Sequence, residues 1–122
     1  MSIVIPVYNE EANLPRLLPR LVPVLEAMGR PWEVVFADDG SRDRSLDLLK
    51  AAARDYPGRV KAVELLRNAG QHMAIMAALG ETDGEYVITL DADLQNPPEE
   101  VPKLVAKIDE GPDVVGTVRA MR

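Results

Sequence analysis

The sequence predicts an α/β fold in which a mainly parallel sheet of about five strands is flanked by helices. Five short runs rich in β-branched residues are almost continuously apolar, as in strands that are buried on both faces of a parallel sheet. These runs are 2–8, 33–37, 59–66, 86–90 and 113–118. The segments between them have helical apolar spacing, and alternating strands and helices favour an open sheet with right-handed crossovers.

The first helical segment, 11–29, combines a leucine stripe with three prolines. With Asn13 as N-cap, Pro15 falls in the first turn, where proline does little harm. The two later prolines lie opposite the leucine stripe, and a helix convex toward solvent can accommodate them by bending. The residues predicted on this solvent side are Arg16, Pro19, Arg20 and Pro23.

Three further segments are compatible with helices: 43–56, 71–80 and 99–110. The second of the four predicted helices, 43–56, has an apolar stripe at three- and four-residue steps. The last follows a double proline, and Asn96 or a neighbour is the expected N-cap, with two glutamates in the first turn.

Length and composition favour one soluble globular domain spanning 1–122. The net charge of −6 argues against a nucleic-acid-binding surface, and the absence of cysteine excludes disulfides and thiolate sites. There is no basic signal-peptide region and no apolar run of roughly 20 residues, so we expect a cytoplasmic chain. Because the chain stops after the fifth predicted strand, we expect a fragment of a longer protein, whose uncovered edge strand would favour homo-oligomers.

Polar clusters follow the first four predicted strands. They read "YNEE", "DDGSRD", "RNAGQH" and "DADLQN" in chain order. Since the carboxyl ends of parallel strands meet at one edge of the sheet, the four clusters predict one ligand site there.

Some of these residues have a simpler explanation as turns and caps. The second cluster could be a strand-to-helix turn, with Gly40 at positive φ and Ser41 or Asp43 as N-cap. Such a cap explains one acidic residue and not the adjacent pair. Asn68 and Gly70 could likewise be turn residues.

Asp91 and Asp93 are harder to explain as surface residues. At ~5 Å and an effective dielectric constant of ~20, two carboxylates repel by roughly 3 kcal/mol. Alternate side chains at a strand end can point the same way, so the two aspartates can provide hard oxygen ligands, and Gln95 continues the alternation with a neutral oxygen. A divalent cation, Mg²⁺ or Mn²⁺, bound to a diphosphate would remove the repulsion.

Other common chemistries have no support in the sequence. There is no G-x-G-x-x-G or G-x-x-x-x-G-K-[ST] loop to hold a phosphate. The single histidine, His72, lies near a predicted helix start, where a surface or packing role is expected. No Ser/His/Asp system can therefore be assembled, and the catalytic residue stays unknown.

Four segments together resemble the family 2 glycosyltransferases of the GT-A fold. They are "SIVIPVYNEE", "DDGSRDRS", "LLRNAGQHMAIMAAL" and "YVITLDADLQNPPEEVPKLV", and the similarity extends over nearly all 122 residues, in the family's order. The similarity is greatest to polyprenyl-phosphate sugar transferases, both the bacterial undecaprenyl-phosphate enzymes and those like dolichol-phosphate mannosyltransferase. The resemblance implies a Rossmann-like GT-A nucleotide-binding half, the N-terminal donor-binding part of a catalytic domain.

The resemblance also implies a reaction. A sugar would move from a nucleotide-diphosphate sugar, with UDP favoured, to a polyprenyl phosphate, with inversion and with Mg²⁺ or Mn²⁺ as cofactor. The general base is expected outside this chain. Membrane contact is expected only through absent parts, with the parent enzyme at the cytoplasmic face of the inner membrane.

Carried over residue by residue, the resemblance implies both a donor site and a metal site. The implied substrate-binding residues are Pro6, Tyr8, Asn9, Glu10, Asp38, Asp39, Arg67, Asn68, Gly70, Gln71, Asp91 and Ala92. Within this set, Asp39 or its neighbour Asp38 matches the aspartate that bonds the base edge. The implied metal ligands are Asp91 and Asp93, with Gln95 beside them.

Three other classes remain open at this stage. A haloacid-dehalogenase-type phosphatase also uses D-x-D, but typically on an early strand and followed by Thr or Val, whereas Leu-Gln follows here. A phosphoacceptor receiver domain requires a lysine after the fifth strand, and none is present. A nucleotide-sugar-binding module without turnover is the non-enzymatic alternative for this chain taken alone.

Overall fold

The computed structural model describes residues 1–82, 87–93 and 97–109. Its sheet has four parallel strands in the order β3-β2-β1-β4. The strands are β1 (Ser2–Val7), β2 (Glu33–Asp39), β3 (Val60–Leu65) and β4 (Val87–Thr89). The predicted α/β class and parallel sheet are confirmed, and the fifth predicted strand, 113–118, lies outside the described residues.

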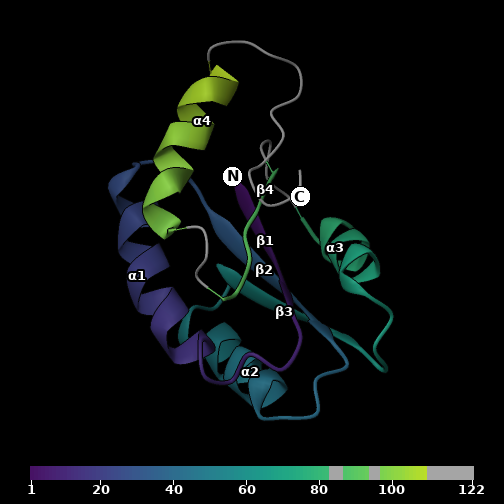
Figure 1. The fold of residues 1–122 in the computed structure, drawn as a ribbon. Coiled ribbons are helices and arrows are strands. Elements are labelled where there is room, and N and C mark those ends of the chain that lie inside the picture. The colour runs from purple at the N-terminus through teal and green to yellow at the C-terminus, as the bar shows by residue number, and fades with distance from the viewer. Residues whose placement is uncertain (83–86, 94–96, 110–122) are drawn as a thin grey trace.

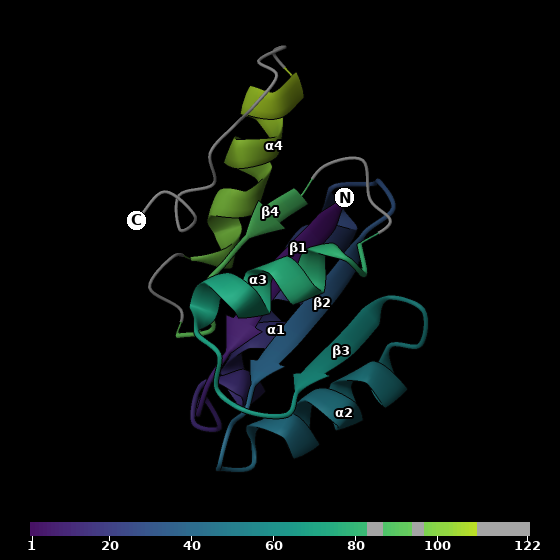
Figure 2. The same cartoon turned by 90° about the vertical axis from the view of Figure 1, so that its right-hand side faces the viewer.

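The helices cover both faces of this sheet. They are α1 (Leu14–Ala27), α2 (Ser45–Asp55), α3 (Gln71–Leu79) and α4 (Val101–Asp109), with a short 3₁₀ helix η1 (Pro98–Glu100) before α4. Figure 1 shows α1 and α4 on one side of the sheet and α3 on the other, and Figure 2 shows α3 lying across β1 and β2.

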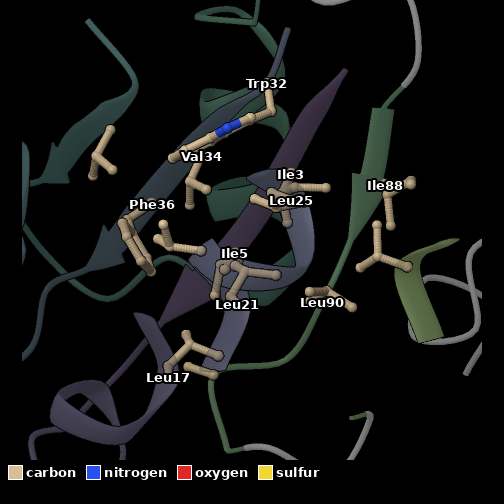
Figure 3. Close-up of a cluster of buried hydrophobic side chains, with 14 of the residues drawn as sticks. Ile3, Ile5, Leu17, Leu21, Leu25, Trp32, Val34, Phe36, Ile88 and Leu90 are labelled. Carbon is tan, nitrogen blue, oxygen red and sulfur yellow. The ribbon is translucent and has the colours of Figure 1, made fainter. Parts of the chain in front are cut away.

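The larger hydrophobic core lies between one face of the sheet and the helices α1, α2 and α4, which cover that face. Ile3 and Ile5 of β1, Phe36 of β2 and Leu21 of α1 are at most 1% exposed and pack in one cluster (Figure 3). Full burial of each such side chain contributes about 1.5–3 kcal/mol. On the opposite face a smaller cluster joins α3 to the sheet; its buried members are Val4, Val35, Ala37, Ala74 and Ala78.

The first helix begins at Leu14, directly after the predicted N-cap and three residues into the helical segment 11–29. Asn13 is its N-cap, as expected, but its side chain makes no cap bond and donates instead to Glu10 Oε1 at 2.8 Å. Pro15 lies in the first turn, which confirms its predicted place. The predicted solvent side is also exposed: Arg16, Pro19, Arg20 and Pro23. The bend of the helix stays a prediction.

The start of α2 corrects the prediction that Ser41 or Asp43 is its N-cap. The N-cap is Arg44, without a side-chain bond. Asp43, the residue before the N-cap, makes the capping contact instead. Its Oδ1 accepts a hydrogen bond from the first helical N–H, that of Ser45, at 2.8 Å. Gly40 has a φ of +74°, which confirms the predicted positive φ.

The last helix also starts later than predicted, at Val101, because the 3₁₀ helix η1 precedes it. The expected cap Asn96 lies outside the described residues. Arg20 of α1 binds Glu99 of η1 at 2.7 Å, and this bond lowers the pKa of Glu99 below its ordinary value. The contact ties η1, and with it the start of α4, to α1.

Candidate functional site

A cavity of about 280 Å³ opens at the carboxyl edge of the sheet. This is close to the lower end of the range for small-molecule sites, roughly 300–1,000 Å³. Its lining residues are Pro6, Val7, Tyr8, Glu10, Asp39, Asn68, Gly70, Gln71, Asp91, Ala92 and Asp93. All four predicted polar clusters therefore contribute to one cavity.

The sheet order explains why residues far apart in the chain meet here. After β3 the chain returns to the other side of β1, so β1 and β4 form the point where the strand order reverses, the usual ligand crevice of open α/β sheets. In the β1–β4 ladder Val4 pairs with Thr89. Extended by two residues beyond the end of β4, this register would set Asp91 beside Pro6, and both residues line the cavity.

The cavity wall is strongly acidic. Glu10, Asp39, Asp91 and Asp93 line it, and none of the described lining residues is basic. Without a cation, the carboxylates would repel the negative charges of a diphosphate placed in this cavity. Asp91 and Asp93 are half-buried and supply the hard oxygens that Mg²⁺ and Mn²⁺ prefer.

These donors fit a cation that is shared with a ligand, and they do not form a cage made by protein alone. Among the residues that the structure describes, no group of three or more His, Cys, Asp or Glu side chains could hold a metal ion. Mg²⁺ is commonly bound by one or two carboxylates together with substrate phosphates. The predicted third ligand, Gln95, lies outside the described residues.

The segment after β1 is held in place by the segment before α2. Asn9, at a left-handed φ of 53°, accepts a hydrogen bond from Arg42 N–H at 2.8 Å and donates its own N–H to Ser41 Oγ at 2.9 Å. One residue on, Glu10 N–H donates to Ser45 Oγ at 2.8 Å. Asn9 does not line the cavity; it orders the turn that carries Tyr8 and Glu10 into the wall.

A fourth bond strengthens the same contact between the two loops. Glu11 N–H donates to Asp43 Oδ2 at 3.2 Å. Partial burial raises the pKa of Asp43, but hydrogen bonds from the Ser45 hydroxyl and from the N–H groups of Ser45 and Glu11 outweigh it and hold the pKa below its ordinary value.

The two adjacent aspartates of β2 point to opposite faces of the sheet, because strand side chains alternate. Both are buried, at 1% and 3% exposure. Asp39 lines the cavity, whereas Asp38 does not. Asp38 Oδ2 accepts a hydrogen bond from Ser41 N–H at 3.1 Å, and its Oδ1 has no partner in the part of the chain that the structure describes.

The loop from β3 to α3 is split in the same way. Asn68, Gly70 and Gln71 line the cavity, whereas Arg67 is exposed outside it. His72 is also exposed, as predicted. Val7 is a lining residue that sequence reasoning missed; its only signal was its position between two predicted site residues.

Comparisons with known proteins place the chain in a family. The model of glycosyl transferase family 2 matches residues 2–122, and the chain belongs to this family. Over all 122 residues it is 57% identical to the undecaprenyl-phosphate 4-deoxy-4-formamido-L-arabinose transferase of Pectobacterium atrosepticum and 52% identical to the enzyme of that name from Salmonella paratyphi B. The chain spans 37% of the length of each of these relatives.

Solved structures confirm the GT-A type of fold. S. aureus TarS 1–349 in complex with UDP superposes with a TM-score of 0.67 at 29% identity, over 89% of this chain and 32% of that one. The mannosyltransferase PcManGT from Pyrobaculum calidifontis, in complex with GDP-Man and Mn²⁺, gives a TM-score of 0.71 at 25% identity, over 93% and 33%. In the described residues of this chain, every helix is too short or too polar to cross a membrane.

Proposed function

We propose that residues 1–122 form the donor-binding part of a glycosyltransferase that moves a sugar from a nucleotide diphosphate onto a polyprenyl phosphate. The observation that carries the proposal is the cavity at the β1–β4 crevice, where the D-x-D carboxylates meet the segments after β1, β2 and β3. An acidic cavity with no basic lining residue among those described suits a ligand that brings its own cation.

In this proposal the nucleoside lies toward Pro6 and Tyr8, and the diphosphate lies toward the D-x-D segment. Tyr8 is 44% exposed and lines the cavity, where an aromatic face can stack on a base. Asp91 and Asp93 would hold Mg²⁺ or Mn²⁺. That cation would neutralise the charge that develops on the departing diphosphate.

The donor and acceptor are proposed from the relatives. TarS is described with UDP, and PcManGT with GDP-Man and Mn²⁺, and the closer sequence match to TarS favours UDP here. The names of the 57% and 52% identical relatives contain undecaprenyl phosphate, which supports a polyprenyl phosphate acceptor. Transfer with inversion fits this scheme, since a single displacement requires no nucleophile from the protein.

A second candidate is donor binding without turnover. It is favoured by the coverage, because the chain spans 37% of the relatives and the general base is expected beyond it. A cytoplasmic location, membrane contact through other parts of the protein, and self-association stay predictions.

The test is calorimetric titration of the chain with UDP, with and without Mn²⁺, and with GDP as the control. The proposal expects UDP to bind only when Mn²⁺ is present and GDP to bind more weakly. A transfer assay with undecaprenyl phosphate then separates an enzyme from a binding module. Binding of neither nucleotide would contradict the donor site.

A further inference from the structure

The short loop before α2 places three polar side chains toward the interior of the chain. Ser41 and Asp43 are half-buried and Ser45 is buried, whereas Arg42 and Arg44 between them are exposed. The exposed fraction of Ser45 is 0%. Because buried polar groups are normally hydrogen-bonded, the partners of these side chains indicate what the loop does.

The partners are three consecutive backbone N–H groups of the loop after β1. Asn9 N–H donates to Ser41 Oγ at 2.9 Å, Glu10 N–H to Ser45 Oγ at 2.8 Å, and Glu11 N–H to Asp43 Oδ2 at 3.2 Å. Outside a helix or a strand, such N–H groups have no regular backbone partner and must be bound by side chains or water. The loop before α2 therefore takes the place of secondary structure for residues 9–11.

The hydroxyl of Ser45 bonds in two directions. Its Oγ accepts from Glu10 N–H, and it donates to the Asp43 carboxylate, one of the bonds that hold the pKa of Asp43 below its ordinary value. A hydroxyl has a single hydrogen to donate, so the bond to Asp43 directs the lone pairs of Ser45 toward Glu10. Asp43 thus fixes the orientation of the hydroxyl that holds Glu10.

Glu10 is also held from the start of α1. Its C=O accepts from the N–H groups of Asn13 and Leu14, both at 3.0 Å, and its Oε1 accepts from Asn13 Nδ2 at 2.8 Å. Together with the bond to Ser45, these contacts fix the backbone N–H, the backbone C=O and the carboxylate of Glu10. Glu10 and Tyr8 line the cavity, whereas Ser45 does not.

We infer that Ser45 and Asp43 are positioning residues of the nucleotide site, which hold Tyr8 and Glu10 in the cavity wall through the backbone of residues 9–11. The inference rests on the proposed donor site. Loss of the Ser45 hydroxyl leaves Glu10 N–H without its acceptor, and the loop is then free to take other positions. The resulting loss of nucleotide affinity must depend on Tyr8, whereas a residue that only stabilises the fold would act independently of Tyr8.

The experiment is a double-mutant cycle in UDP affinity, measured by calorimetry with Mn²⁺ present. The chains are the wild type, Ser45→Ala, Tyr8→Ala and the double variant, with Asp43→Ala measured beside them. Lys50→Gly is the matched control, because Lys50 is exposed in the middle of α2 and glycine there lowers helix stability by propensity alone. Hydrogen exchange of the amides of residues 9–11 is measured without nucleotide on the wild type and on the three single variants in 43–50.

We expect Ser45→Ala to weaken UDP about tenfold, because an unsatisfied N–H group costs roughly that much. In the Tyr8→Ala background the same change should weaken UDP less than about threefold, since the side chain that Ser45 positions is already truncated. Exchange of the Glu10 amide should accelerate about tenfold in Ser45→Ala. Lys50→Gly should leave the UDP affinity and the exchange of residues 9–11 at their wild-type values.

Asp43→Ala tests the orientation of the Ser45 hydroxyl. Asp43 accepts from Glu11 N–H and makes no bond of its own to Glu10 N–H. We therefore expect Asp43→Ala to accelerate exchange at both amides, with a smaller factor at Glu10 than Ser45→Ala produces, and to weaken UDP. Wild-type exchange of the Glu10 amide in Asp43→Ala would remove Asp43 from the inference.

Equal losses of UDP affinity from Ser45→Ala in the two backgrounds would overturn the inference, because Ser45 would then not act through Tyr8. Unchanged exchange of the Glu10 amide in Ser45→Ala would also overturn it. A loss of affinity in Lys50→Gly as large as that in Ser45→Ala would assign the effect to the stability of α2. If the wild-type chain binds no UDP, the proposed donor site fails, and the exchange measurement alone decides whether Ser45 and Asp43 hold the loop.

Discussion

Replacement of Gly40 by alanine tests the close contact between the loops after β2 and β3. Gly40 has a φ of +74°, and a left-handed backbone costs an L-residue about 1–2 kcal/mol. The added Cβ would also lie 2.5 Å from the backbone N of Asn68, where ordinary contact begins at 3.4 Å. The loop must therefore move by roughly 0.9 Å, which strains the hydrogen bonds that residues 68–70 donate to the Asp39 carboxylate and costs about 2–3 kcal/mol more.

Gly29→Ala provides the matched control for this change. Gly29 has a similar φ of +69°, but a Cβ there meets nothing within 4 Å. It should lose only the backbone term of about 1–2 kcal/mol, against roughly 3–5 kcal/mol for Gly40→Ala. Urea denaturation of the two variants and the wild type, analysed at a common m-value, gives both differences.

Equal losses in the two variants would refute the reasoning, because the steric term would then be absent. Gly58→Ala, at a φ of +79° and with nothing within 4 Å of its Cβ, provides a second estimate of the backbone term alone. The two controls should agree to within about 0.5 kcal/mol.

Three further changes test the site and its supporting loops. Asp93→Asn should lower Mn²⁺-dependent UDP affinity at least about tenfold without shifting the urea midpoint, and an unchanged calorimetric affinity would contradict its role as a metal ligand. Asn9→Gly should lower the free energy of unfolding by about 1 kcal/mol, because Arg42 N–H loses its acceptor. Asn9→Ala should lower it by about 1–2 kcal/mol more, because alanine is strained at a φ of 53°. A less stable glycine variant in urea denaturation would contradict this reasoning. Asp43→Ala should destabilise the chain by about 1 kcal/mol at pH 7. Because the pKa of Asp43 in the folded chain lies below the ordinary 3.8, the stability difference between the wild type and Asp43→Ala should narrow as the pH falls below 3.8. A difference that persists in acid unfolding experiments would contradict the role of the Asp43 carboxylate.

The sequence was sufficient for the order of elements, because each carries its own local periodicity. The strand between 33 and 39 shows the limit. Its last two residues are Asp38 and Asp39, and the apolar pattern that defines a buried strand ends before them. Burial of the two carboxylates depends on neighbouring loops, so the apolar pattern of the strand itself does not predict it.

The site was predictable to the level of its polar clusters and not to the level of individual side chains. Parallel strands bring the clusters to one edge whatever their sequence separation, so the lining by Glu10, Asn68 and Asp93 follows from topology. Asn9 and Arg67 lie beside lining residues and yet outside the cavity. Which of two neighbours faces a cavity depends on turn dihedrals, and the left-handed φ of Asn9 has no signature in its neighbours.

The adjacent aspartates of β2 show why a pair of like charges can be retained at a strand end. If both faced one cavity, they would repel each other there, and one role would explain only one of them. Strand alternation separates them: Asp38 accepts from Ser41 N–H in the turn that leads to α2, and Asp39 binds the loop that leads to α3. One strand end therefore orders two loops on opposite faces of the sheet.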